Sequence, residues 1–196
     1  MAKSTKSAKT KSAKVKKTSG EEFITEDALN SGSSRYLNKL PAGVTQIRII
    51  SRPIAGWLEW VDKKPIRTPL SDGEPEASDE DNRPKKFLAM VVLDKSDDSV
   101  KIMEITQQSI IKAIRALTNN PDWGEPFSYD LNIEKTGEDL KTKYTVTPSP
   151  KKPLSKDQVA EARKNPCNLE ALFEGEDPWS EDNTEHTEYH LVAGKR

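Results

Sequence analysis

The chain has 196 residues and a formal net charge of −1, with 31 basic residues, 32 acidic residues and one cysteine. This length suits one domain of ordinary size, and a lone cysteine excludes an intrachain disulfide and favours an intracellular protein. No apolar run approaches the roughly 20 residues that a membrane helix needs. The basic N-terminus also lacks the apolar core of a secretory signal, so we expect a cytoplasmic protein without a membrane partner.

The two ends of the chain carry opposite charge. Residues 1–34 begin with a lysine-rich head and hold too few apolar side chains to fold, so we expect a disordered head and linker. Residues 155–196 contain a predicted short helix, capped by Ser155 and reaching Lys164, followed by an acidic tail that we expect to be disordered. Most apolar residues lie between these ends, and residues 35–154 form the predicted domain.

Apolar patterns within this domain predict strands and one long helix. The predicted strands cover residues 44–51, 56–61, 87–93, 100–105, 129–134 and 143–147. Helical spacing of isoleucines and a leucine predicts a helix over residues 107–117, with Thr106 as its N-cap. Residues 70–82 are acidic with almost nothing apolar, which predicts a mobile loop.

This order of strands, one helix and two further strands predicts a mainly β, α+β fold. It matches the OB-type small barrel, in which a helix lies between the third and fourth strands. Other small α+β folds have the same order, and the periodicity does not choose between them.

Aromatic and cationic residues gather in the first half of the predicted domain. Proteins bind single-stranded nucleic acid with cations that contact phosphates and with aromatic rings that stack on bases. Trp57 and Trp60 are three positions apart, so a strand places them on opposite faces, one in the core and the other available for stacking. The predicted DNA-binding residues are Arg48, Arg52, Trp57, Trp60, Lys63, Lys64, Arg67, Arg83, Lys85, Lys86, Phe87 and Lys143. The alternative is that both tryptophans are core residues and the lysines form a solvated rim.

Motifs for catalysis or metal binding are weak. His186 and His190 have i, i+4 spacing in the acidic tail, but further ligands and a rigid frame are missing from this segment. Cys167 has no histidine nearby in the sequence, and no glycine-rich phosphate loop or zinc-spaced cysteine pattern occurs. We therefore expect no enzymatic activity, no cofactor and no metal site.

Several stretches resemble a known family. They are ITQQSIIKAIRAL, NPDWGEPFSYDLNIEK and LKTKYTVTPSP, with RYLNKLPAGVTQIRII, GWLEWVDKKPIRTP and RPKKFLAMVV upstream. Together they resemble the single-stranded DNA-binding proteins of tailed bacteriophages over residues 35–154. The resemblance implies an OB-fold, a role in phage DNA replication or recombination in the host cytoplasm, and no enzymatic activity. The acidic C-terminus also resembles those of single-stranded DNA-binding proteins in general.

These observations predict sequence-tolerant binding of single-stranded DNA. We expect the acidic tail to compete with DNA for the cationic surface or to recruit replication and recombination proteins. We expect the lysine-rich head to bind phosphates, or the acidic tail of a neighbouring copy, which would produce self-association. One alternative function is an adaptor that binds a host replication or transcription factor through its tails. Another is a binder of duplex DNA or RNA that depends mainly on the head.

Overall fold

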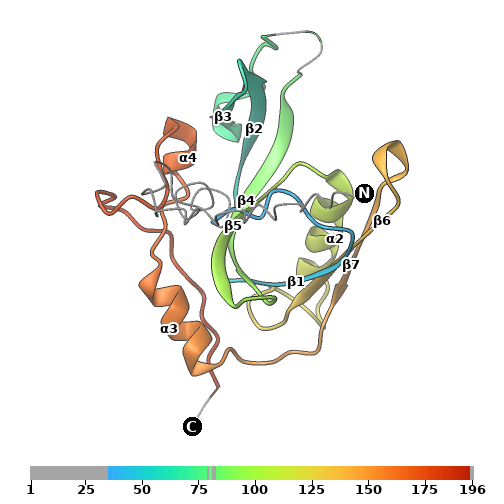
Figure 1. The fold of residues 1–196 in the computed structure, drawn as a ribbon, viewed down its shortest axis with the longest axis vertical. Helices are drawn as coiled ribbons and strands as arrows, with labels where there is room; N and C mark the ends of the chain where they lie inside the picture. The colour runs from blue at the N-terminus through green and yellow to red at the C-terminus, as the bar shows by residue number, and fades with distance from the viewer. Residues whose placement is uncertain (1–34, 79, 81–82, 195–196) are drawn as a thin grey trace, which may run out of the picture.

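The computed structural model describes residues 35–78, 80 and 83–194 (Figure 1). Its strands are β1 (Gly43–Ile49), β2 (Ile54–Val61), β3 (Lys64–Pro69), β4 (Lys85–Asp94), β5 (Ser99–Ile105), β6 (Leu131–Thr136) and β7 (Lys143–Pro148). Its helices are α2 (Gln108–Thr118), α3 (Lys156–Lys164) and α4 (Ala171–Glu174), with 3₁₀ turns η1 (Leu70–Asp72) and η2 (Asp139–Lys141). No helix in this part of the chain is long and apolar enough to cross a membrane. The predicted disordered head and linker, residues 1–34, lie outside the described residues.

All strand pairs are antiparallel, and they form one sheet in the order β3-β2-β4-β1-β6-β7. Strand β5 joins this sheet through β4, where Leu88 is paired with Ala55 of β2 on one edge and with Ile105 of β5 on the other. The sheet curves strongly (Figure 1), but within the described residues no pairing of β5 with β7 closes it into a barrel. The predicted mainly β fold is confirmed, and the sheet is not a closed barrel.

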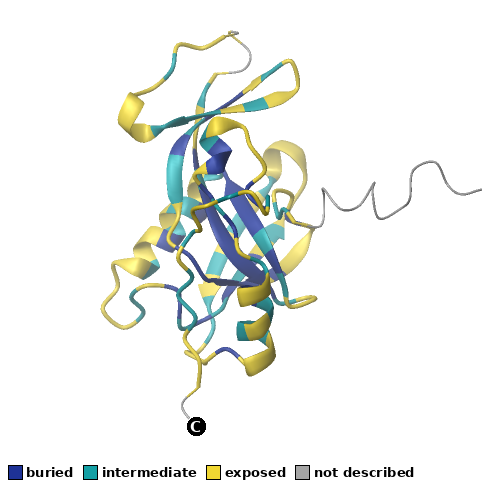
Figure 2. Cartoon of the chain, turned by 90° about the vertical axis from the view of Figure 1, so that its left-hand side faces the viewer, coloured by how far each residue is buried: buried dark blue, intermediate teal, exposed yellow. Residues whose placement is uncertain are grey.

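The sheet buries apolar side chains on both faces. Successive side chains of the long strand β4 point to opposite faces and belong to two different clusters. Ala89 and Val91 belong to one cluster, and Met90 and Val92 belong to the other. The second cluster lies between the sheet and α2, which contributes Ile110. The first cluster lies between the sheet and the C-terminal part of the chain, and Figure 2 shows the buried strands enclosed by more exposed outer elements.

Residues 165–194, which we call the C-terminal segment, pack on the sheet. Their buried side chains include Cys167, Leu169, Ala171, Leu172 and Trp179. Tyr189 forms an isolated bridge with Ser51 after β1, and the backbone N–H of His190 donates to the carbonyl of Ile50 at 2.7 Å. The predicted disordered tail is therefore wrong for these residues, and the predicted domain end at residue 154 is too early. The apolar side chains spaced between the acids fill a face of the sheet that would otherwise be exposed.

The β2–β3 hairpin projects from the rest of the sheet, at the top of Figure 1. Asp62 and Lys63 connect its strands with φ of 49° and 64°, the left-handed geometry of a two-residue type I′ turn. Strand β3 was not predicted, because Pro65 and Pro69 interrupt its pattern. An edge strand tolerates proline, since one of its sides makes no ladder hydrogen bonds.

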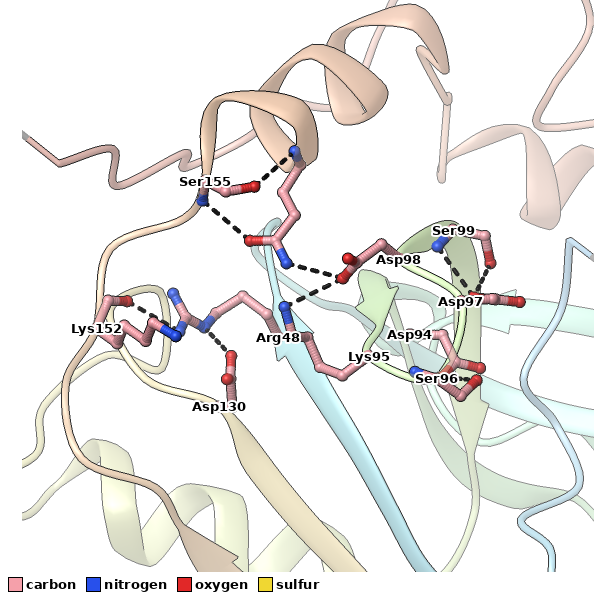
Figure 3. Close-up of polar contacts among 11 residues, drawn as sticks. Arg48, Asp94, Lys95, Ser96, Asp97, Asp98, Ser99, Asp130, Lys152 and Ser155 are labelled. Carbon is pink, nitrogen blue, oxygen red and sulfur yellow. Dashed lines mark hydrogen bonds and ion pairs between the residues drawn. The ribbon is translucent and has the colours of Figure 1, made fainter.

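Helix α3 begins at its predicted cap and contacts the β4–β5 turn (Figure 3). The hydroxyl of Ser155 accepts from the backbone N–H of Gln158 at 3.2 Å, and the Gln158 side chain accepts from the backbone N–H of Ser155 at 3.0 Å. This capping box satisfies two backbone donors at the helix start. The Gln158 amide also donates to Asp98 at 2.8 Å, which ties α3 to the sheet.

Candidate nucleic-acid interface

The two tryptophans of β2 lie on opposite faces of the hairpin, as their spacing predicts. Trp60 is the register partner of Pro65, and Trp57 is the register partner of Thr68. They are three positions apart along one strand, an odd spacing, so their side chains point to different faces. Neither ring belongs to a buried cluster, so the prediction that one of them is a core residue is wrong.

Trp57 is half-buried and already covered by a cation. The ammonium of Lys86 lies 4.9 Å from the centre of the Trp57 ring, a cation–π contact. Lys86 is also the register partner of Trp57 on β4, so the sheet itself places the two side chains together. A base would have to displace Lys86 in order to stack on this face of the ring.

Trp60 is 51% exposed and lines a groove of about 480 Å³, which we call the Trp60 groove. The groove lies between the hairpin and α4. Helix α4 packs against β3, and Figure 1 shows the two elements near each other. Side chains that share it with Trp60 include Tyr36, Asn38, Lys64, Arg67, Glu104 and Glu176. An exposed aromatic ring, two cations and two carboxylates therefore line one surface.

A second hollow, of about 120 Å³, also borders Trp60. Arg83 and Lys85 line this hollow together with Thr106. Basic side chains thus occur in both depressions that meet at the ring. A single strand that crossed Trp60 would have cations close to the phosphates on either side of the stacked base.

Arg67 is held in the Trp60 groove by an ion pair. Its Nε lies 2.6 Å from Oε2 of Glu104, and the two side chains are only 9% and 6% exposed. The pair links β3 to β5, which are not neighbours in the sheet, and so fixes the hairpin relative to the body of the domain.

Burial raises the pKa of Tyr36, another residue of the groove, to about 12, so its hydroxyl remains protonated at neutral pH.

Arg48 and Phe87 were predicted to contact DNA, and the structure corrects both predictions. Arg48 is 1% exposed, and its Nε lies 2.7 Å from Oδ1 of Asp130 (Figure 3). Its guanidinium also donates to the carbonyl of Lys152 at 3.0 Å. Phe87 is likewise 1% exposed and packs with Phe173, with ring centres 6.0 Å apart. Both side chains are structural, because neither reaches the surface.

The remaining predicted contacts are exposed but lie apart from the Trp60 groove. Lys63 occupies the tip of the hairpin. Arg52 forms an exposed ion pair with Glu125 at 2.8 Å. Lys143 begins β7, at the opposite end of the strand order from β3. The structure therefore gathers only part of the predicted set around Trp60, namely Lys64, Arg67, Arg83 and Lys85.

Several groove residues were missed by the sequence analysis. Tyr36 and Asn38 enter the groove because the chain bridges β5 at Ile102 in parallel orientation. Glu176 enters it because α4 packs against β3. Neither contact leaves a local sequence signal, since each joins segments far apart in the chain.

Within the described residues, metal-binding and nucleophilic groups form no second candidate site. Among the described residues, no group of three or more histidine, cysteine, aspartate or glutamate side chains is arranged to hold a metal ion. Burial raises the pKa of Cys167 to about 12, so its thiol is a poor nucleophile at neutral pH. His190 stacks on Phe127, with ring centres 4.2 Å apart, and takes part in packing.

Comparison with known proteins gives one informative similarity. No protein-family profile matches the chain, and no solved structure matches it. The chain is 27% identical over 137 residues to a probable ssDNA-binding protein of Escherichia phage T5, an alignment that covers 55% of this chain and 52% of that protein. The chain thus spans about half the length of the curated relative that it matches.

Proposed function

We propose that this protein binds single-stranded DNA without requiring a sequence motif, with Trp60 as the residue that stacks on a base. Lys64, Arg83 and Lys85 contribute positive charge near the flanking phosphates, whereas Glu104 neutralises the buried Arg67. The observation that carries the proposal is the half-exposed Trp60 ring at the junction of two hollows that each contain basic side chains. The similarity to a probable ssDNA-binding protein supports it.

The fold supports an OB-type interpretation of this function. If the β2–β3 hairpin is set aside, the chain has five strands in the order β1, β4, β5, β6 and β7. Helix α2 lies between the third and the fourth of these strands, which is the order of an OB barrel. The β2–β3 hairpin is then an insertion between the first and second barrel strands. In OB proteins that connection is one of the nucleic-acid-binding loops, which agrees with an interface on the hairpin.

We further propose that the protein acts on single strands exposed in phage DNA replication or recombination, in the host cytoplasm and without catalysis. The phage origin of the relative supports this setting. The alternative of an adaptor that acts through free tails is weaker, because residues 165–194 of the acidic end pack on the sheet.

Two tryptophan variants test the proposed function. Trp60→Ala should lose the stacking contribution of about 1–3 kcal/mol per base, whereas Trp57→Ala serves as the matched control on the opposite face. Affinity is measured by anisotropy with a labelled single strand and with the matched duplex at one salt concentration. The single strand should bind more tightly than the duplex, and only Trp60→Ala should weaken its binding strongly. Equal affinity for both DNA forms, or unchanged binding by a folded Trp60→Ala variant, contradicts the proposal.

A further inference from the structure

The Trp60 groove has two chemically different walls. On the hairpin side, Lys64 and Trp60 present a cation and an aromatic ring. On the other side, Glu176 presents a carboxylate at the end of α4. A surface that recognised only phosphates would not need an acidic wall, because a carboxylate repels phosphate oxygens.

The backbone of Glu176 is fixed at the groove. Gly175 ends α4 in the left-handed conformation with φ of 73°, which glycine adopts without strain. The backbone N–H of Glu176 then donates to the carbonyl of Ala171 at 3.0 Å. This hydrogen bond ends the helix and fixes the backbone position of Glu176 beside the groove.

Glu176 is also the more available of the two groove carboxylates. Glu104 accepts from Arg67 and is 6% exposed, so its charge is already compensated. Glu176 is exposed, and no ion pair found within the described residues engages it. Within the described residues its carboxylate therefore has no ion-pair partner, and Glu176 brings an available acceptor to the lining of the groove.

A carboxylate accepts hydrogen bonds but donates none, so it selects among base edges. Cytosine presents the N4 amino donor, whereas thymine presents the O4 acceptor at the same position. The one ring N–H of thymine lies between two carbonyl oxygens, which repel an approaching carboxylate. We propose that Glu176 contacts the edge of a base stacked on Trp60, and that the groove takes cytosine in preference to thymine. This inference rests on the proposed binding of single-stranded DNA.

The test compares oligo(dC) with oligo(dT) of equal length, in mildly alkaline buffer that keeps cytosine unprotonated. We expect the wild-type protein to bind oligo(dC) at least about tenfold more tightly, which is the lower end of the effect of one charge-assisted hydrogen bond. Glu176→Gln should bring the ratio of the two affinities close to one, because an amide both donates and accepts. Glu174→Gln is the matched control, since Glu174 is an exposed acid two residues away, at the end of α4 and outside the groove lining, and should keep the wild-type ratio.

The possible outcomes separate this inference from the proposed function. A wild-type ratio at or below one overturns the inference while leaving single-strand binding intact. An equal gain in affinity for both oligonucleotides on Glu176→Gln also overturns it, because Glu176 would then act only as a repelling charge. Absence of binding to either oligonucleotide overturns the proposed function, and the inference with it.

Discussion

Replacing Trp179 by alanine tests whether the acidic C-terminal segment is part of the folded domain. The Trp179 side chain is 9% exposed and packs in the same cluster as strand β4. The guanidinium of Arg35 lies over the ring, 5.3 Å from its centre. A disordered tail would predict no change in stability, so this one substitution separates the two descriptions of the segment.

The expected loss follows from the burial of the ring. A buried aromatic side chain of about 150–250 Å² corresponds to about 4–6 kcal/mol as an upper bound, and Trp→Ala substitutions in cores cost about 3–5 kcal/mol. The indole Nε1 is buried without a hydrogen-bond partner among the described residues, which offsets part of the gain from packing. We therefore expect Trp179→Ala to lower the free energy of unfolding by about 3–4 kcal/mol.

Urea denaturation followed by far-UV circular dichroism measures this loss. Trp60→Ala is the matched control, because it makes the same chemical change at a ring that is 51% exposed and outside the buried clusters. Its unfolding midpoint should stay close to that of the wild-type protein. If Trp179→Ala unfolds at the wild-type midpoint with the wild-type slope, the C-terminal segment does not pack as described.

Two further predictions concern buried charges. Burial alone would raise the pKa of Asp94, but hydrogen bonds from Lys101 and Ser96 outweigh it and hold that pKa below its ordinary value. The wild-type protein should therefore be more stable than Asp94→Asn near neutral pH. The difference in urea midpoint between the two proteins should vanish as the pH falls through the lowered pKa of Asp94. A difference that stays constant with pH would refute this prediction. Asp130→Asn should cost about 3 kcal/mol in urea unfolding, because it leaves the buried Arg48 charge without its partner, and an unchanged midpoint would show that the pair is not buried.

The central part of the fold was predictable from local patterns. Strands β1, β4, β5 and β7 alternate or run apolar over enough residues to be recognised, and α2 has isoleucines at helical spacing. The cap of α3 was found from Ser155, since its capping geometry depends on neighbours three residues away. Each of these signals is contained within one element.

What was missed depends on contacts between distant segments. The C-terminal segment has few apolar residues among many acids, so its composition resembles that of a disordered tail. Its order comes from the sheet face that Leu172 and Trp179 cover. Arg48 was taken for a DNA contact, because nothing near it in the sequence reveals that Asp130 neutralises it in the core. The position of Glu176 in the Trp60 groove has the same long-range origin.

The packing of the C-terminal segment changes how its negative charge can act. A free acidic tail would compete with DNA by moving into and out of the cationic surface. A segment held by buried Trp179 and by the bridge of Tyr189 with Ser51 cannot leave without exposing apolar surface of the sheet. Its charge therefore acts from fixed positions, as the Glu176 wall of the groove does. Truncation after Phe173 would remove these anchors together with the acids, so a change in DNA affinity would report on folding as well as charge. Single glutamate-to-glutamine substitutions separate the two effects, because they remove the charge and leave the packing in place.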